Sequence, residues 1–283
     1  MDVCLVTAGT LYVVATPLGN LGDLSDRAIH VLRAVTVVAA EDTRRARVLL
    51  QHADARPRVL SFHAHSPPAR IASIVRTLAE GQDVALIADA GTPTVSDPGA
   101  NLVQRARDAG AAVVAVPGPS AVAAALSVSG LSADRFTFLG FLPRKGADRK
   151  RLLEQAAGSP WTTVLFESPN RLVKLLVELG AACGGDRKAV VTRELTKVHE
   201  EARAGTLDSL EGYYREHAPR GEVTVVVAGI SRSEAAPRVD EAEVSARARE
   251  LLDEGVTRRD AATELAKEFP IARREAYRIV SNL

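Results

Sequence analysis

Cysteine is scarce in this sequence of 283 residues, which contains only Cys4 and Cys183. Two cysteines can form neither a disulfide framework nor a four-ligand zinc site on their own. Such a composition is typical of proteins that work in a reducing compartment, so we expect a cytoplasmic protein.

Long apolar runs are also absent. Residues 3–19 are moderately apolar, but Asp2 stands where a signal peptide needs a basic segment, and Pro17 interrupts the run. No stretch approaches the roughly 20 apolar residues that a membrane-spanning helix needs. We therefore expect neither a signal peptide nor a membrane span.

Aromatic residues make up only 4% of the chain, and the formal net charge is only +1. The core must therefore be built from Val, Leu, Ile and Ala. The overall charge favours neither nucleic acid nor another charged partner, so any basic binding surface has to be local.

The most informative stretch is residues 84–99, VALIADAGTPTVSDPG. Its apolar start is typical of a strand buried on both faces of a parallel sheet. A loop rich in glycine, proline and hydroxyl groups follows, and then a helical pattern. Because ligands of open α/β sheets bind beyond the carboxyl ends of strands, this loop is either part of a binding site or an ordinary strand-to-helix connection.

The first 128 residues alternate between strand and helix patterns, which predicts a doubly wound parallel sheet. Ser25 can cap the first helix, and Gly81 can end the helix that opens at Pro67–Pro68. The predicted strands cover residues 11–16, 35–40, 59–62, 84–88 and 112–116.

From Phe136 onward, strands and helices alternate less regularly, which predicts a mixed sheet in a second, α+β domain. A polar segment without apolar periodicity then predicts a linker, and three helical patterns of helix-turn-helix type follow it. The predicted units are residues 11–122, 123–230, 231–238 (linker) and 239–283.

Four loops follow strands of the predicted parallel sheet: PLGN, EDTR, GTPTVSD and PGPSA. Because the carboxyl ends of parallel strands share one edge, these loops should line a common cleft. PLGNLG is similar to a dinucleotide-binding fingerprint, but Pro17 replaces its first glycine. His63 and His65 lack a third ligand nearby, so we expect no metal site.

The EDTRR segment, residues 41–45, has two interpretations. In the structural one, Asp42 or Thr43 caps the following helix while Arg44 and Arg45 face solvent. In the functional one, an acid and an arginine at a strand end position a charged substrate. The residues themselves favour capping slightly.

Eight motifs follow one another along the chain: ATPLGNLGDLS, AEDTR, ADAGTPTVSDPG, VPGPSA, GFLPRKG, FESPNR, RELTK and GEVTVVVAG. In this order they closely resemble the ribosomal RNA small-subunit methyltransferase I family, in the tetrapyrrole-methylase-like class (class III) of S-adenosylmethionine-dependent methyltransferases. The resemblance covers residues 11–230, and the terminal helices also resemble that family's C-terminal domain.

The resemblance implies a two-domain α/β fold with S-adenosylmethionine in the interdomain cleft and a small C-terminal helical domain. It further implies a homodimer and 2′-O-methylation of a cytidine in the 16S ribosomal RNA of the small subunit. One departure is a His-Glu-His-Asn run of the family, which here reads His63, Ala64, His65 and Ser66. The acid of that run is missing.

The motifs of the resemblance also imply cofactor contacts. We expect backbone groups around Gly91 to approach the cofactor closely, because a bulky side chain would block them. The residues expected at the cofactor are Pro17, Leu18, Ala90, Gly91, Thr92, Val95, Ser120, Ala121, Phe166, Glu167, Leu195 and Thr224.

A ribose hydroxyl is a poor nucleophile, so a general base should assist its methylation. The candidates are Asp42, Glu167 and Lys197, with Arg44 or Arg171 holding a phosphate. RNA binding should be electrostatic. The strongest local basic patch comprises Arg144, Lys145, Arg149, Lys150 and Arg151, although a solvated helix start would have the same composition.

The terminal helical unit, residues 239–283, holds eight Arg and Lys against ten Asp and Glu. This balance argues against a DNA-binding tail, although Arg273, Arg274 and Arg278 can form a positive face on the last helix. We expect this unit to dock on the ribosomal substrate or the dimer partner. Two alternatives stay open: a tetrapyrrole C-methyltransferase of the same fold, and a nucleotide-sensing regulator with a DNA-binding tail.

Overall fold

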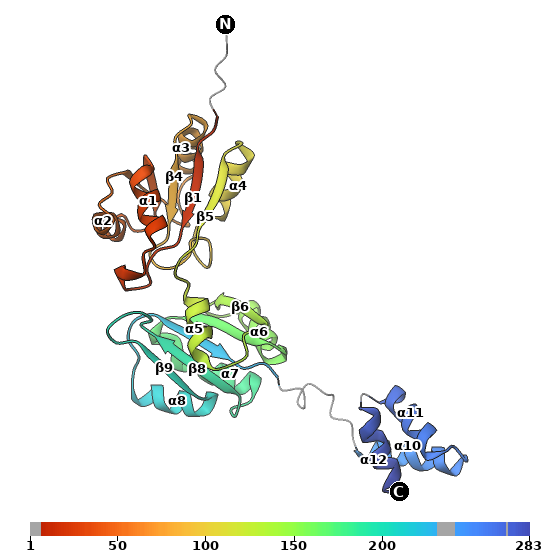
Figure 1. Ribbon diagram of the computed structural model, residues 1–283. Coiled ribbons are helices and arrows are strands. Elements are labelled where there is room, and N and C mark those ends of the chain that lie inside the picture. Colours follow the sequence, from red (N-terminus) through yellow and green to blue (C-terminus); the bar gives the residue numbers. More distant parts are fainter. Residues whose placement is uncertain (1–6, 231–240, 270) are drawn as a thin grey trace.

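The computed structural model describes residues 7–230, 241–269 and 271–283. Figure 1 shows two α/β domains that follow one another along the chain and a helical bundle at the C-terminus. Cys4 and the predicted linker, residues 231–238, lie outside the described residues. Among the described residues, no helix combines the length and the apolar character needed to cross a membrane.

The first domain contains the predicted parallel sheet. Its central strands are buried on both faces, as the apolar run at residues 84–87 predicted: every residue of β4 is buried. All neighbouring strands pair in parallel, in the order β3-β2-β4-β1-β5. The strands are β1 (Thr10–Val14), β2 (Val37–Ala40), β3 (Arg58–Ser61), β4 (Val84–Ile87) and β5 (Ala112–Val116).

Helices cover both faces of this sheet (Figure 1). Helices α1 (Asp26–Ala34) and α2 (Thr43–His52) pack on one face, and α3 (Pro68–Ala79) and α4 (Ala100–Asp108) on the other. The side chain of Ser25 accepts a hydrogen bond from the Ala28 N–H, so the predicted cap of α1 is confirmed. A 3-10 turn, Leu21–Asp23, precedes α1.

The second domain contains a mixed sheet of order β6-β7-β10-β8-β9, as predicted. Only β6 and β7 pair in parallel; the other neighbours are antiparallel. Strand β9 was not predicted, because its sequence, EARAGT, has no large apolar residue, and the side chains that are partly buried include the charged Glu201 and Arg203. The strands are β6 (Phe136–Phe141), β7 (Thr162–Glu167), β8 (Lys188–Arg193), β9 (Glu201–Thr206) and β10 (Val223–Val227).

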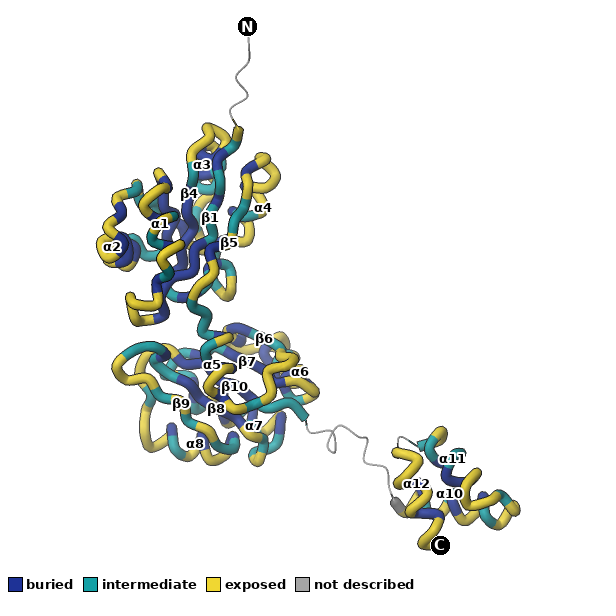
Figure 2. The backbone as a smooth tube through the Cα atoms, in the orientation of Figure 1, coloured by how far each residue is buried: buried dark blue, intermediate teal, exposed yellow. Residues whose placement is uncertain are grey.

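Two layers of helices cover the mixed sheet, and Figure 2 shows the buried residues concentrated along the strands between them. Helix α5 (Ala121–Ser129) packs on the face that carries Val164, Val190 and Val226. The opposite face is covered by α6 (Ala147–Gly158), α7 (Leu172–Cys183) and α8 (Leu207–Glu216). A 3-10 turn, Pro169–Arg171, precedes α7.

Helix α5 packs on the second sheet, and the predicted boundary at residues 122–123 falls inside this helix. The three predicted C-terminal helices are present and share a core of their own. They are α10 (Glu241–Asp253), α11 (Arg258–Glu268) and α12 (Arg273–Ser281).

Candidate active site

The loops that follow the parallel strands meet at one edge of the first sheet, as their topology predicted. The backbones of Thr16 and Gly91 exchange two N–H···O hydrogen bonds of 2.9 Å. The hydroxyl of Thr92 donates to the carbonyl of Pro119 at 3.1 Å. These bonds connect the loops after β1, β4 and β5 into one rigid wall.

The loop after β4 holds several residues in the left-handed backbone region. Thr94 has a φ of 72° and Ser96 a φ of 63°, which cost roughly 1–3 kcal/mol each and are typically found at functional sites. Gly91 has a φ of 79°, and a Cβ added there would lie 3.3 Å from Cδ2 of Leu18. The loop therefore presents backbone groups without bulk at this point.

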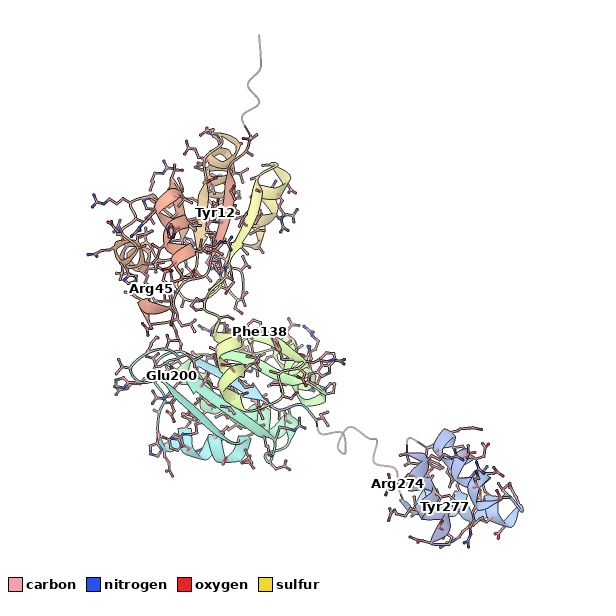
Figure 3. The ribbon with its side chains drawn as sticks, in the orientation of Figure 1. Tyr12, Arg45, Phe138, Glu200, Arg274 and Tyr277 are labelled. Carbon is pink, nitrogen blue, oxygen red and sulfur yellow. The ribbon has the colours of Figure 1, made fainter. Side chains whose placement is uncertain are left out.

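A cavity of about 450 Å³ lies between this wall and the second domain, within the size range of small-molecule sites. Figure 3 shows Arg45 of the first domain and Phe138 of the second on the sides of the two domains that face each other. The cavity is lined by Leu18, Glu41, Arg45, Asp89, Ala90, Gly91, Thr92, Val95, Ser96, Asp97, Ser120, Ala121, Val122, Phe141, Phe166, Glu167, Ser168, Pro169, Gly221, Glu222, Val223 and Thr224.

The charged residues of this lining are predominantly acidic. Five carboxylates contribute, and Arg45 is the one basic side chain in the lining. Burial and the nearby charges of Glu41, Asp89 and Glu222 raise the pKa of Asp97 to about 6. Burial and Asp89 likewise raise the pKa of Glu41. Concentrated negative charge of this kind favours a cationic ligand.

Two lining carboxylates, Glu41 and Asp97, have no hydrogen bond or ion pair with any residue that the structure describes, and Asp97 is the more deeply buried of the two. Asp89, by contrast, accepts a hydrogen bond from the Asp42 N–H at 2.9 Å and lies 3.6 Å from the Arg45 guanidinium. A carboxylate without a protein partner is costly to bury, so Asp97 is the group that a cationic ligand would stabilise most.

Most residues expected at the cofactor line this cavity, and their binding role stays a prediction. Pro17 and Leu195 do not line it; Leu195 packs beside Leu18 in the apolar cluster beneath α5. The ten that do are Leu18, Ala90, Gly91, Thr92, Val95, Ser120, Ala121, Phe166, Glu167 and Thr224.

Asp42 has the capping role that the residues themselves favoured. Its carboxylate accepts a hydrogen bond from the Arg44 N–H at 2.7 Å and pairs with the Arg44 guanidinium at 2.9 Å. The hydrogen bonds from Arg44 lower the pKa of Asp42 to about 2, which makes it a poor proton acceptor. Neither side chain lines the cavity.

Glu167 lines the cavity at the end of β7, and its side chain is almost completely buried. One carboxylate oxygen accepts from the Ser168 N–H at 2.8 Å, and the other lies 3.1 Å from the Arg171 guanidinium. Arg171 also donates to the Leu142 carbonyl at 3.0 Å. This guanidinium therefore positions Glu167, and its expected contact with a phosphate stays a prediction.

Lys197 lies beside the cavity and contacts one of its lining residues. Its ammonium donates to Glu194 at 2.9 Å and to Glu222 at 3.3 Å. Burial lowers the pKa of Lys197, but the hydrogen bond to Glu194 and the charge of Glu222 outweigh burial, so the pKa is raised. Lys197 therefore carries a proton at neutral pH and can supply positive charge, but it cannot act as a base there.

The basic patch after β6 needs one correction. Arg149 was expected on the surface, but its side chain is only 5% exposed, because it pairs with Glu178 and donates to the Pro143 carbonyl at 2.8 Å. Lys150 and Arg151 are exposed and pair with acids on their own helix.

Arg144 and Lys145 are exposed as well, with no hydrogen bond or ion pair to the part of the chain that the structure describes. These two residues are the free cations of the patch.

Several lining residues were missed by sequence reasoning. Asp89 and Asp97 lie within the stretch singled out first, and their position at a strand end was a usable signal. Glu222 and Phe141 gave no such signal, because the sequence does not reveal which side of the second sheet faces the first domain. Glu41 was visible in the EDTRR motif but was not distinguished from Asp42.

His63 and His65 are exposed, with ring centroids 6.5 Å apart. No group of three His, Cys, Asp or Glu that could hold a metal is present in residues 7–230, 241–269 and 271–283. His63 lines a wider, open groove of about 1060 Å³ between α3 and α4, which meets the cavity at Asp97. The groove is larger than the cavity, but it lacks the converging polar groups of the strand-end loops.

Comparisons with known proteins agree with this architecture. Residues 10–211 match the family described as tetrapyrrole (corrin/porphyrin) methylases. Two solved structures share the fold: a cobalt precorrin-4 methyltransferase (TM-score 0.61, 19% identity) and a uroporphyrin-III-C-methyltransferase from Thermus thermophilus (TM-score 0.54, 24% identity). Each similarity covers 77% of this chain and 94% of the other.

Similarity to curated proteins is higher. A protein of Synechocystis sp. named ribosomal RNA small subunit methyltransferase I is 42% identical over 271 residues, which cover 96% of this chain and 97% of that protein. A protein of the same name from Xylella fastidiosa is 44% identical and covers 95% and 98%, respectively. Another from Pseudomonas aeruginosa is 46% identical and covers 79% and 80%.

Proposed function

We infer that this chain, which belongs to the ribosomal RNA small subunit methyltransferase I family of tetrapyrrole-methylase-like enzymes, methylates the RNA of the small ribosomal subunit. We propose S-adenosylmethionine as the methyl donor and the 2′-hydroxyl of a cytidine in 16S ribosomal RNA as the acceptor. The enzyme is proposed to act as a homodimer in the cytoplasm.

The cavity residues fit the proposed donor. S-adenosylmethionine has a cationic sulfur and ammonium, an apolar purine face and a ribose. The acidic lining suits the two cationic groups, and the unpartnered Asp97 carboxylate is the side chain best placed to contact one of them. Leu18, Val122 and Phe166 offer apolar contacts for the purine.

When bound, S-adenosylmethionine supplies an electrophilic methyl group on its positively charged sulfur. The protein's own task is then positioning, which is worth roughly 7–11 kcal/mol at best. The rigid wall made by the loops after β1, β4 and β5 holds the donor side of the cavity. The second domain lines the other side with Phe141 and Phe166, which would limit the access of water to a bound donor.

Among the catalytic candidates, Glu167 is the one that lines the cavity, and we propose it as the carboxylate that orients the acceptor hydroxyl. Arg171 and the Ser168 N–H fix its position. Replacing Glu167 with Gln keeps the shape and removes the charge. The rate of methyl transfer at saturating donor should fall about 100-fold or more. An unchanged rate would remove Glu167 from this role.

The acidic cavity at the strand ends is the observation that carries the proposed function. The relatives named as ribosomal RNA methyltransferases support it, because their similarity extends over more than nine tenths of this chain. Incubation with radiolabelled S-adenosylmethionine and either small subunits, naked 16S RNA or a porphyrin precursor tests it. We expect the radiolabelled methyl group to appear in the RNA, on the ribose of a cytidine. Label in the porphyrin precursor alone would contradict it.

A further inference from the structure

Phe141, the last residue of β6, combines two features that are rarely found together. Its side chain lines the cavity, and the residue is 56% exposed. Single exposed apolar residues are common on protein surfaces and need no explanation. An exposed aromatic ring at the mouth of a reaction cavity is different, because a flat ligand can stack on it.

A β-bulge places this ring on the cavity side of the sheet. Phe138 pairs with Val164 and Phe141 pairs with Phe166, so three steps along β6 match two steps along β7. Without the extra residue, side-chain alternation would put Phe141 on the opposite face, beside Leu139. Bulges commonly re-aim side chains next to active sites.

The bulge also lies against the first domain. Gly140 has a φ of 62°, and a Cβ added to it would lie 2.8 Å from Oγ of Ser96, in the loop after β4. The same irregularity in β6 therefore turns Phe141 towards the cavity and lets the two domains come together beside it.

Other rings support Phe141 from within the protein. The ring centroids of Phe141 and Phe166 are 5.5 Å apart at an interplanar angle of 59°, and Phe166 packs edge-on against Phe138 at 4.9 Å. This cluster anchors one side of the Phe141 ring, while more than half of the residue stays open to solvent.

The chain that follows Phe141 supplies positive charge. Leu142 is buried and fixes the start of the loop, and Arg144 and Lys145 are exposed without a partner among the described residues. An aromatic face followed within a few residues by free cations is the combination that binds single-stranded nucleic acid, since the ring stacks on a base and the cations meet phosphates.

We propose that Phe141 is the stacking platform for the base of the nucleotide that accepts the methyl group. This inference rests on the proposed RNA substrate and adds to it a binding site for one unpaired base. The base stacks on the open face of the ring, and its ribose then lies at the cavity mouth. Stacking tolerates any base, so Phe141 positions the acceptor without choosing its identity.

Four variants test the proposal on the full-length protein. F141A and F141L remove the ring, and F141L keeps an apolar side chain of similar size; F141W and F141Y restore an aromatic face. F136A is the matched control, because Phe136 lies at the other end of β6 with a similar exposure of 44% and does not line the cavity.

Three measurements are made on each variant: kcat/KM for small subunits, co-sedimentation with small subunits in the presence of S-adenosylhomocysteine, and calorimetric binding of S-adenosylhomocysteine alone. F141A and F141L should lose about 10-fold or more in kcat/KM and in subunit affinity, the size expected for one stacked base. F141W, F141Y and F136A should stay close to wild type, and the affinity for S-adenosylhomocysteine should change much less than the affinity for small subunits in every variant.

Two results would overturn the proposal. If F141L matches wild type on small subunits, no base stacks on the ring. If F141A loses S-adenosylhomocysteine affinity in proportion to activity, Phe141 is a wall of the donor site. A wild-type protein that methylates no subunits at all would instead refute the proposed function, and the inference with it.

Discussion

Two carboxylates in loops at the same edge of the parallel sheet, Asp42 and Asp97, have opposite surroundings. In the loop after β2, Asp42 is paired with Arg44 and caps α2, and its pKa is lowered to about 2. In the loop after β4, Asp97 is half-buried without a partner, and its pKa is raised to about 6. The difference teaches that a carboxylate with protein partners has a structural role. A carboxylate without partners in a cavity is a candidate for ligand binding.

Replacing Asp97 with Asn should have the largest effect on this comparison. It removes the charge that the protein leaves available for a cation, so the affinity for S-adenosylmethionine near neutral pH should fall about 10- to 100-fold, as expected for a lost charge-assisted contact. Calorimetry measures this affinity. D42N is the matched control and should bind as wild type does. Equal affinities for D97N and wild type would contradict the distinction between the two carboxylates.

The pH dependence of S-adenosylmethionine binding should distinguish the two carboxylates next. A bound cation favours the ionised form of Asp97, so binding below about pH 6 must release a proton. The affinity for S-adenosylmethionine should rise by up to about tenfold between about pH 5 and 7 and then level off, because Asp97 is then already ionised.

The proton release is counted by calorimetry in buffers of different ionisation enthalpy. D97N keeps the neighbouring charged residues Glu41, Asp89, Glu222 and Arg45 and lacks only the Asp97 carboxyl. Its affinity for S-adenosylmethionine should therefore stay constant between about pH 5 and 7. S-adenosylhomocysteine, whose sulfur is neutral, should show a shallower rise. A D97N profile as steep as that of wild type would assign the proton to another group.

Stability should change in opposite directions at the two positions. The pKa of Asp97 is raised on folding, so its ionisation destabilises the folded state as pH rises from about 4 through 6. D97N lacks this ionisation and should melt about 1–3 °C higher than wild type near neutral pH. The advantage should vanish below about pH 4. D42A loses the cap of α2 and should melt a few degrees lower.

Thermal unfolding followed by circular dichroism at both pH values checks these shifts. The ionised Asp42 stabilises the folded protein fully above its ordinary pKa of about 4, and this stabilisation is lost as pH falls through the lowered pKa of about 2. The difference in melting temperature between D42A and wild type should therefore disappear only as pH approaches about 2. Shifts of the same sign in both variants would contradict the comparison.

Replacing Arg44 with Ala should have the smallest effect. The ion pair with Asp42 is exposed, and such pairs contribute little to stability. Methyl transfer should stay within about twofold of wild type, while the pKa of Asp42, measured by carboxyl ¹³C NMR, should rise from about 2 towards its usual range. A large loss of activity would return Arg44 to the catalytic candidates.

The parallel sheet and its strand-end loops could be predicted because they depend on local patterns. The buried run at residues 84–87 and the capping residue Ser25 determine strand and helix without reference to the rest of the chain. The meeting of the loops then follows from parallel topology. The same logic singled out the loop that contains Gly91 and Thr92, whereas the contacts expected of these two residues came from the family resemblance.

Features that depend on tertiary contacts could not be predicted in this way. Arg149 has the composition of a surface cation, but Glu178 on another helix makes it part of the core. The side that Phe141 faces depends on one extra residue in β6. The raised pKa of Asp97 depends on its burial and on the charges of Glu41, Asp89 and Glu222, which only the fold brings near it.

The most direct test of the unpartnered carboxylate is the pKa of Asp97 in solution, measured by carboxyl ¹³C NMR with D97N used to assign the signal. In the ligand-free protein we expect a pKa of about 6, and with S-adenosylmethionine a clear decrease that S-adenosylhomocysteine does not fully reproduce. An ordinary pKa that S-adenosylmethionine leaves unchanged would contradict the account.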